Sequence, residues 1–421
     1  MAKIVKHTKE ILVYADWKEL DGAMLMGTLY SDRLRGKEIF SFTYSRAWLE
    51  KGLSTELDPD LGFYSGPQYM QVEKINFGLF TDSAPDRWGR VLMERREALS
   101  ARLEDRKALP LFESDFLLGV YDKYRMGALR FKLAAGDAFL NDNNLFKVPP
   151  FTSLRTLEEA SLQLENSDAE EDPSYTKWLS ILLSPGSSLG GARPKASVAD
   201  PHGQLWIAKF PSTSDRRDIG GWEVVVNELA KQAGIKVAEG TARRFTQKNH
   251  TFLTKRFDRK KEERIHFASA MTLLGQSDGA NADSNVSYLH LAEFIMRHGV
   301  QTDIDLEELW KRIVFYICIS NSDDHLRNHG FLLTQGGWML SPAFDINPVP
   351  NSSGLSLNIS ENSNALDLEL AREVAQQFRV QEKKREQIIN KIINAVIQWK
   401  EVARKFDIKR SEINEMETAF Y

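Results

Sequence analysis

The chain has 421 residues, 42% of them hydrophobic and 27% charged, which is the composition of an ordinary globular protein. This excludes a disordered chain, a collagen-like chain and a repetitive fibre, and the length is enough for two or three domains. The formal net charge of −4 excludes bulk binding of nucleic acid through net charge.

The cysteine content and the apolar runs indicate the compartment. A single cysteine, Cys318, cannot form a disulfide within the chain, and the first residues, MAKIVKHTKE, do not read as a signal peptide. The longest apolar run, residues 313–319, is shorter than the about 20 residues that a membrane span needs. We therefore expect a cytoplasmic protein that makes no membrane contact.

The first part of the chain predicts a mixture of strands and helices. Residues 11–20 and 23–32 alternate between apolar and polar side chains, which is typical of strands in a hairpin or meander. Residues 81–106 predict a helix, and residues 116–133 return to the residue types of strands and turns. A polar, proline-containing stretch at 136–151 predicts the first domain boundary.

The second part begins with a glycine-rich turn, PGSSLGGARPKA. Strand candidates at 195–200 and 204–210 follow it, and residues 221–233 predict a helix. After Arg259 the apolar residues recur at three- and four-residue steps, as in 306–317, which predicts helices. A β-rich part followed by a helix-rich part indicates two lobes with a cleft.

The densest polar cluster, NSDDHLRNHGFLL at 321–333, follows the most apolar predicted helix. Asp323 and Asn328 stand five residues apart, as do the Asp and Asn of the catalytic loop of protein kinases. In that loop the Asp takes or orients the proton of the attacking hydroxyl, and the Asn oxygen binds Mg²⁺, which prefers hard oxygen ligands. The alternative is a polar loop with the turns that Asn and Asp side chains favour.

A second carboxylate, Asp345, follows a predicted hairpin. HGFLL and WMLSPAF read as two short strands around the turn TQGG, and the second strand leads to Asp345 in SPAFDINP. Kinases also place their second metal-binding Asp after a hairpin. Ile346 and Asn347 replace the Phe and Gly of the kinase D-F-G motif, so its Phe-flip switch is not expected. The alternative is a turn residue before Pro348.

A phosphate site needs backbone donors and a cation. The glycine-rich turn permits close approach of backbone N–H groups, but it is not a Walker A motif, because Ala192 follows Gly191 where Lys is required. A plain hairpin turn is the alternative. Lys209, in the strand LWIAKF, resembles the Lys of the kinase V-A-I-K motif, and Glu223 on the next helix is its first partner candidate. Lys195 is a further candidate for a phosphate contact.

These motifs occur in one order along the chain. They are the loop S-L-G-G-A-R-P-K, the strand Lys, the helix Glu, R-F-D-R, N-S-D-D-H-L-R-N and F-D-I-N-P. This order resembles the HipA family, the serine/threonine-kinase toxins of bacterial toxin–antitoxin modules. The resemblance spans the whole chain. Its most specific parts are N-S-D-D-H-L-R-N and Lys209, whereas the N-terminal segments DSAPDRWGR and FLLGVYDKYRMGALRF match more loosely.

The resemblance implies a role for each matching residue. Asp323 is expected to be the catalytic base, Asn328 and Asp345 to bind Mg²⁺, and Ser188 to be a site of autophosphorylation that switches the kinase off. A hinge against adenine is expected at residues 255–257. The residues expected to bind the nucleotide are Ser188, Leu189, Gly190, Gly191, Ala192, Arg193, Lys195, Lys209, Glu223, Lys255, Arg256, Phe257 and His325.

The family also implies substrates and partners. Known relatives phosphorylate aminoacyl-tRNA synthetases, and the family's partner is a small helix-turn-helix antitoxin that binds operator DNA. DNA contact of this chain is then expected only through that partner. One departure concerns the protein substrate. Many members carry H-Q-E-D after R-F-D-R, and this chain has Phe267, Ala268 and Ser269 there.

The sequence therefore predicts an α+β, protein-kinase-like bilobal fold. It divides the chain into an N-terminal α/β domain (1–140), a small kinase lobe with the glycine-rich loop and the ATP-binding Lys (141–259) and a mostly helical C-terminal lobe with the catalytic loop (260–421). The predicted function is an ATP- and Mg²⁺-dependent serine/threonine protein kinase. The alternatives are a small-molecule or lipid kinase on a related fold, and an inactive kinase-like co-repressor or binding subunit.

Overall fold

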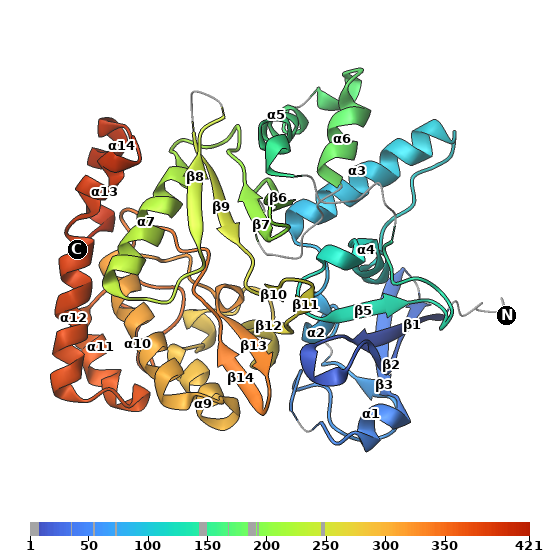
Figure 1. The fold of residues 1–421 in the computed structure, drawn as a ribbon, viewed down its shortest axis with the longest axis horizontal. Helices are drawn as coiled ribbons and strands as arrows, with labels where there is room; N and C mark the ends of the chain where they lie inside the picture. The colour runs from blue at the N-terminus through green and yellow to red at the C-terminus, as the bar shows by residue number, and fades with distance from the viewer. Residues whose placement is uncertain are drawn as a thin grey trace. The chain divides into compact units, whose positions relative to one another are not determined.

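A computed structural model describes residues 8–34, 36–53, 55–71, 74–142, 150–166, 168–183, 191, 193–245 and 249–421 (Figure 1). The chain divides into two compact units. The first comprises Met1–Ile207 with Asp258–Ala268, and the second comprises Ala208–Phe257 with Ser269–Tyr421. The division into three domains at 140 and 259 stays a prediction. In the described part of the chain, no helix is long and apolar enough to cross a membrane.

The first unit is built on a five-stranded antiparallel sheet with the order β4-β3-β2-β1-β5. Its strands are β1 (Thr8–Ala15), β2 (Met24–Leu34), β3 (Lys37–Tyr44), β4 (Gln68–Tyr69) and β5 (Leu129–Lys132). Alternate residues of β1, namely Ile11, Val13 and Ala15, are fully buried, as a sheet with one face on the core requires. The predicted meander is thus present in β1 and β2.

Helices complete the first unit. They are α1 (Arg46–Glu50), α2 (Gly78–Thr81), α3 (Arg87–Leu103), α4 (Glu113–Gly119), α5 (Leu154–Leu164) and α6 (Tyr175–Leu183), with 3-10 turns η1 (Lys18–Leu20), η2 (Asp122–Tyr124), η4 (Phe151–Ser153) and η5 (Ala169–Glu171). Helix α3 matches the predicted helix. The prediction of strand and turn was wrong for residues 116–119, which end α4. Asp115 caps that helix by accepting from Phe112 N at 3.1 Å, and this overrides the strand-like apolar run.

The glycine-rich turn leads into a four-stranded sheet with the order β6-β7-β9-β8, and the boundary between the units falls within β7. The strands are β6 (Lys195–Ala199), β7 (Leu205–Lys209), β8 (Gly240–Arg243) and β9 (Thr251–Lys255). Helix α7 (Ile219–Ala233) lies between β7 and β8 in the chain, and Gly234 ends it in the left-handed conformation with φ +81°. Both predicted strands and the predicted helix are confirmed.

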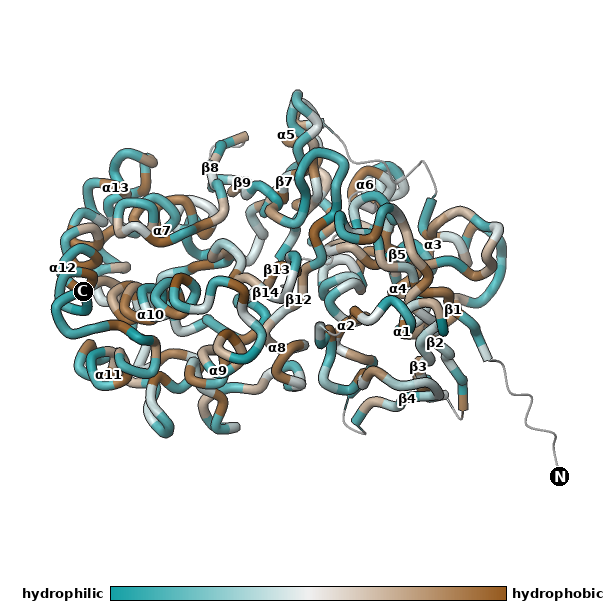
Figure 2. The backbone as a smooth tube through the Cα atoms, turned by 60° about the horizontal axis from the view of Figure 1, so that its bottom comes forward, coloured by the Kyte–Doolittle hydropathy of each residue, from teal (hydrophilic) through white to brown (hydrophobic). Residues whose placement is uncertain are grey.

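The rest of the second unit is mostly helical. Its helices are α8 (Ala270–Leu273), α9 (Tyr288–His298), α10 (Thr302–Cys318), α11 (Leu368–Val374), α12 (Glu382–Val396), α13 (Trp399–Lys405) and α14 (Arg410–Glu415), with η6 (Ala282–Ser284), η7 (Leu326–Asn328), η8 (Ala375–Phe378) and η9 (Met416–Ala419). Figure 1 shows α12 running alongside α10 and α7, which it contacts. The buried residues of α12, among them Ile388, Ile392 and Val396, recur at three- and four-residue steps, in keeping with one buried face, and Figure 2 shows both hydrophilic and hydrophobic segments along it.

Helix α10 is the central helix of this unit and leads directly into the catalytic loop. Leu309, Trp310 and Ile313 are among its fully buried residues, as their spacing predicts. Cys318, its last residue, is also fully buried, and burial raises the pKa of its thiol to about 12. The thiol is therefore neutral at physiological pH.

Five short strands follow β9 in the chain. They are β10 (Arg259–Lys260), β11 (Glu263–Arg264), β12 (Phe267–Ser269), β13 (Gly330–Thr334) and β14 (Gly337–Leu340). The predicted hairpin is confirmed, because β13 pairs with β14 in antiparallel register from Phe331↔Leu340 to Thr334↔Gly337. It carries the chain from the catalytic loop to Asp345.

Candidate functional site

The centre of the candidate site is the ammonium group of Lys209, the last residue of β7. Its Nζ lies 2.5 Å from Glu223 Oε1 and 2.6 Å from Asp345 Oδ1. Glu223 projects from α7, and Asp345 from the segment after β14. The side chains of Lys209 and Glu223 are 15% and 5% exposed, whereas that of Asp345 is 31% exposed. Three elements far apart in the sequence thus bring two carboxylates to one lysine.

The charges of these three groups do not balance. Burial opposes the charge on Lys209, but the carboxylates of Asp345 and Glu223 outweigh burial and raise the pKa of Lys209 above its ordinary value. The ammonium is therefore charged throughout the physiological pH range. One cation and two anions leave a formal charge of −1, with Asp345 as the more accessible carboxylate. Such a group attracts a further cation.

The segment after β14 is tied to the catalytic loop. Asp345 has the left-handed φ of +55°, and the Asn347 side chain donates from Nδ2 to Asp345 Oδ1 at 3.4 Å. The backbone N–H of Asn347 donates to Oδ1 of Asn321 at 3.3 Å. The residue that replaces the Gly of D-F-G thus holds Asp345 and also contacts the start of the loop that carries Asp323.

The catalytic loop turns back on the carbonyl oxygen of Asp323. That oxygen accepts from His325 N at 3.1 Å and from Asn328 Nδ2 at 3.1 Å. Because Nδ2 of Asn328 is used in this way, its Oδ1 remains as an acceptor. Partial burial raises the pKa of the Asp323 carboxyl, and the nearby charges of Asp345 and Asp324 add to this against the opposing effect of His325.

A buried network lies beneath the loop. Asp324 Oδ2 accepts from the hydroxyl of Tyr288 at 2.6 Å and pairs with Nε2 of His329 at 2.7 Å. The three residues are at most 1% exposed. This network fixes the backbone on the C-terminal side of Asp323, and sequence reasoning did not single it out. The N-S-D-D-H motif contained the signal. Asp324 directly follows Asp323, and an acidic side chain that is buried there needs a hydrogen-bond partner.

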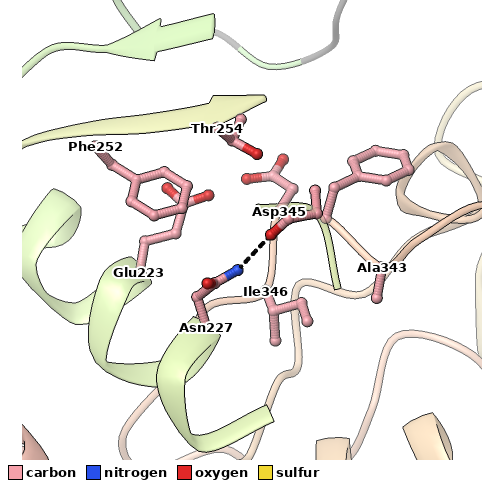
Figure 3. A pocket seen from close by; sticks show the side chains of 9 residues that line it. Glu223, Asn227, Phe252, Thr254, Ala343, Asp345 and Ile346 are labelled. Carbon is pink, nitrogen blue, oxygen red and sulfur yellow. Dashed lines mark hydrogen bonds between the residues drawn. The ribbon is translucent and has the colours of Figure 1, made fainter. Parts of the chain in front are cut away.

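A small pocket adjoins the Lys209 group (Figure 3). It is lined by Glu223, Asn227, Ala238, Phe252, Thr254, Ala343, Phe344, Asp345 and Ile346. Figure 3 shows the carboxylates of Glu223 and Asp345 turned toward each other beside Thr254 of β9. Asn227 follows Glu223 by one helical turn and donates from Nδ2 to the carbonyl oxygen of Ala238 at 3.0 Å. Sequence reasoning missed Asn227, although its four-residue spacing from Glu223 places both on one helix face.

The predicted hinge residues lie at the end of β9. Lys255 extends to Glu239, with 3.5 Å between Nζ and Oε2, and the Arg256 side chain is buried. The ring of Phe257 packs against that of Phe344, with 5.5 Å between the centroids. In the D-F-G motif the aromatic residue follows the Asp. Here Phe344 precedes Asp345, and its ring contacts the predicted hinge at Phe257.

The remaining predicted nucleotide ligands, His325 excepted, belong to the first unit or lie outside the described residues. Ser188, Leu189, Gly190 and Ala192 are outside them. Gly191 has φ +88°, and Arg193 is half-buried. Lys195 is buried, and its Nζ lies 3.0 Å from Oδ2 of Asp86, the N-cap of α3. The phosphate contact expected of Lys195 stays a prediction. His325 is half-buried in the catalytic loop.

The residues expected to hold Mg²⁺ suit that ion. The ligands that the family resemblance implies are the carboxylate of Asp345 and the amide oxygen of Asn328, and in the described ranges no three His, Cys, Asp or Glu side chains form a metal cluster. Both are hard oxygen donors, as Mg²⁺ requires, and two protein ligands leave positions for water and phosphate. The repulsion that raises the pKa of Asp323 in the presence of Asp345 is what a cation between these groups would relieve.

Comparisons with known proteins concern the family and the fold of the chain. The sequence model of the HipA-like C-terminal domain matches residues 187–400, just over half of the chain. HipA of Shewanella oneidensis MR-1, solved in a toxin–antitoxin complex with HipB and its operator DNA, is similar in fold, with a TM-score of 0.63 at 15% identity. That likeness covers 96% of this chain and 94% of that one. It confirms the α+β, kinase-like fold.

Two further relatives are similar over less of the chain. A Haemophilus influenzae protein named as a kinase candidate is 28% identical over 197 residues, which are 41% of this chain and 57% of that protein. The chain thus spans little more than half the length of this curated relative. The Helicobacter pylori proinflammatory kinase CtkA aligns with a TM-score of 0.37 at 15% identity, over 54% of this chain and 90% of that one.

Proposed function

This chain belongs to the HipA-like family, and from that premise we propose that it is an ATP- and Mg²⁺-dependent serine/threonine protein kinase. The observation that carries the proposal is the position of Lys209 between Glu223 and Asp345, at 2.5 and 2.6 Å. Kinases use a lysine with a helix Glu for the phosphates and a nearby Asp for the metal. The Asp323–Asn328 loop provides the other half of such a site.

Each residue has a part in the proposed transfer. Lys209 exchanges its bond with Asp345 for phosphate oxygens of ATP and keeps the bond with Glu223. Asn328 and Asp345 would hold Mg²⁺, which would neutralise negative charge on the phosphates. Asp323 accepts the proton of the acceptor hydroxyl, and its raised pKa makes it a stronger base than an ordinary carboxylate.

The bonds of the proposed reaction balance in a single in-line displacement. A bond forms between the acceptor hydroxyl oxygen and the γ-phosphorus, and the bond from that phosphorus to the β–γ bridging oxygen breaks. ADP leaves with the electron pair of that bond, and the proton goes to Asp323. No covalent intermediate on the protein is needed, so positioning and charge supply the catalysis.

The acceptor is proposed to be a Ser or Thr of a protein, with an aminoacyl-tRNA synthetase as the substrate class that the family suggests. Ser188 is the proposed site of autophosphorylation. The test is incubation of the chain with γ-labelled ATP, Mg²⁺ and a cell extract, followed by separation of protein from small molecules. Labelled protein bands that disappear with Asp323→Ala support the proposal. Label found only in the small-molecule fraction would identify a small-molecule kinase instead.

A small helix-turn-helix antitoxin is proposed as the partner, and the cytoplasm as the compartment. Support comes from the similarity to HipA of Shewanella oneidensis, which was solved with HipB and operator DNA. Contact of this chain with DNA is then indirect. The test is co-expression with the product of a neighbouring small helix-turn-helix reading frame. Co-purification through size exclusion supports the partner, and separate elution argues against it.

A further inference from the structure

A buried ion pair between Asp86 and Lys195 lies apart from the Lys209 group. Nζ of Lys195 is 3.0 Å from Oδ2 of Asp86, and the two side chains are only 4% and 1% exposed. The other carboxylate oxygen of Asp86, Oδ1, accepts from Gly89 N at 2.8 Å and so caps α3. One carboxylate therefore joins the start of α3 to the first residue of β6.

Lys195 also lies close to Gly191 in the glycine-rich turn. Gly191 has φ +88°, and a Cβ atom added there would lie 3.0 Å from Nζ of Lys195. The ammonium group thus lies against the backbone of Gly191. Because Asp86 holds this ammonium in a site with almost no exposure, the backbone at Gly191 is positioned through Lys195 by a residue of the N-terminal region.

We propose that Asp86 is a positioning residue for nucleotide binding. It holds the Lys195 ammonium against Gly191 and so fixes the backbone of Gly191, one of the residues expected to bind the nucleotide. The inference rests on the proposed function. It gives the start of α3 control over ATP affinity, and it makes Lys195 a tether between two backbone segments, in place of an independent ligand of phosphate.

The pair makes a specific kinetic prediction. Asp86 is not among the residues proposed to carry the transfer step, so its loss is expected to change the binding of ATP and leave that step intact. Asp86→Asn is the cleanest change, because Asn retains an oxygen that caps α3 but removes the charge opposite Lys195. Asp60→Asn is the matched control, since it breaks another buried pair of the same unit, in which Asp60 Oδ2 lies 2.6 Å from Lys74 Nζ and the side chains are 7% and 8% exposed.

The experiment measures the dissociation constant of Mg-ATP, the KM for ATP, kcat and the unfolding temperature of the native chain, Asp86→Asn and Asp60→Asn. We expect Asp86→Asn to raise the dissociation constant and the KM on the order of tenfold, with kcat unchanged. Asp60→Asn should lower the unfolding temperature without changing either ATP constant. If the native chain binds Mg-ATP and Asp86→Asn binds it with the same dissociation constant, this inference is wrong and the proposed function stands. If the native chain does not bind Mg-ATP, the proposed function itself is wrong.

Lys195→Met, alone and combined with Asp86→Asn, decides whether the two residues act as one. If Lys195 is a tether held by Asp86, the double variant binds Mg-ATP no more weakly than the weaker single variant. Additive losses would mean that Lys195 meets the phosphates independently, and this overturns the positioning role. Lys195→Arg retains the charge and should restore most of the affinity. If Asp86→Asn does not fold, Lys195→Met is compared with Lys195→Arg, and equal affinity of these two variants overturns the positioning role.

Discussion

Two lysines with carboxylate partners lie in the two units, and their surroundings differ. In the first unit Lys195 faces Asp86 in a pair with at most 4% exposure. In the second unit Lys209 faces both Glu223 and Asp345, and Asp345 is 31% exposed. The first contact joins one ammonium and one carboxylate with little exposure. The second has an excess negative charge on an accessible carboxylate.

The difference separates a structural pair from a reactive group. Removing one member of a buried pair leaves an uncompensated charge, so the Lys195 pair has a strong reason to stay intact. Lys209 can give up Asp345 to a metal ion and still keep Glu223. A lysine that must bind and release phosphates needs the second arrangement, and a lysine that holds backbone in place needs the first.

Among the variants that test this difference between the two units, Asp323→Ala is expected to have the largest effect on phosphoryl transfer. Loss of a general base lowers phosphoryl transfer on the order of 10²- to 10⁴-fold, whereas Mg-ATP binding is retained because Asp323 is not among its ligands. Single-turnover transfer and equilibrium nucleotide binding are measured on the same sample. Residual transfer near the native rate would show that Asp323 is not the base. A similar loss of kcat in Asp86→Asn would abolish the distinction between the two regions.

Asp345→Ala is expected to have the next largest effect. It removes one of the two proposed metal ligands, so the Mg²⁺ concentration that gives half-maximal ATP binding should rise at least about tenfold. Titration of Mg²⁺ at fixed ATP measures this. Asp60→Asn, which changes a carboxylate of the other unit, serves as the control. Equal Mg²⁺ dependence in Asp345→Ala and the native chain would rule out Asp345 as a ligand.

A smaller, graded effect is expected from pH. The pKa of Asp323 lies above the ordinary carboxyl value of 3.8, through burial and the charges of Asp345 and Asp324. A base works in its deprotonated form, so kcat/KM, which reports the free enzyme, should fall as pH decreases through this raised pKa and reach a plateau above it. The pH profile of kcat/KM for Mg-ATP, in a range where the fold is intact by circular dichroism, checks this. A kcat/KM that is constant down to pH of about 4, near the ordinary Asp value, would contradict it.

Much of the second unit could be predicted because its signals are local. The three- and four-residue spacing predicts α10, the hairpin around TQGG predicts β13 and β14, and α7 ends at Gly234 as expected. The residues of the Lys209 group were also named from sequence, because the order of kinase motifs is itself a signal. Their distances were not, since Lys209 and Asp345 are 136 residues apart and only the folded chain joins them.

The first unit was harder to predict, for two physical reasons. The run at 116–119 is too short for its periodicity to distinguish strand from helix, and the Asp115 cap decides in favour of α4. The partner of Lys195 is Asp86, 109 residues away, and no local pattern links them. Sequence reasoning proposed Lys195 as a phosphate contact because it lies beside glycines, and that contact stays a prediction. In the second unit the buried Tyr288–Asp324–His329 network was missed for the same reason, because Tyr288 lies in α9, 36 residues before Asp324.

The central claim is that the group of Lys209, Glu223 and Asp345 binds the nucleotide. It is tested most directly by calorimetric titration of Mg-ATP into the native chain, Lys209→Met and Lys231→Met, where Lys231 is an exposed lysine on α7, the helix of Glu223. Loss of charged hydrogen bonds to phosphate should weaken binding by about 10- to 100-fold in Lys209→Met. Lys231→Met should bind as the native chain does. Equal affinity of Lys209→Met and the native chain would contradict the account.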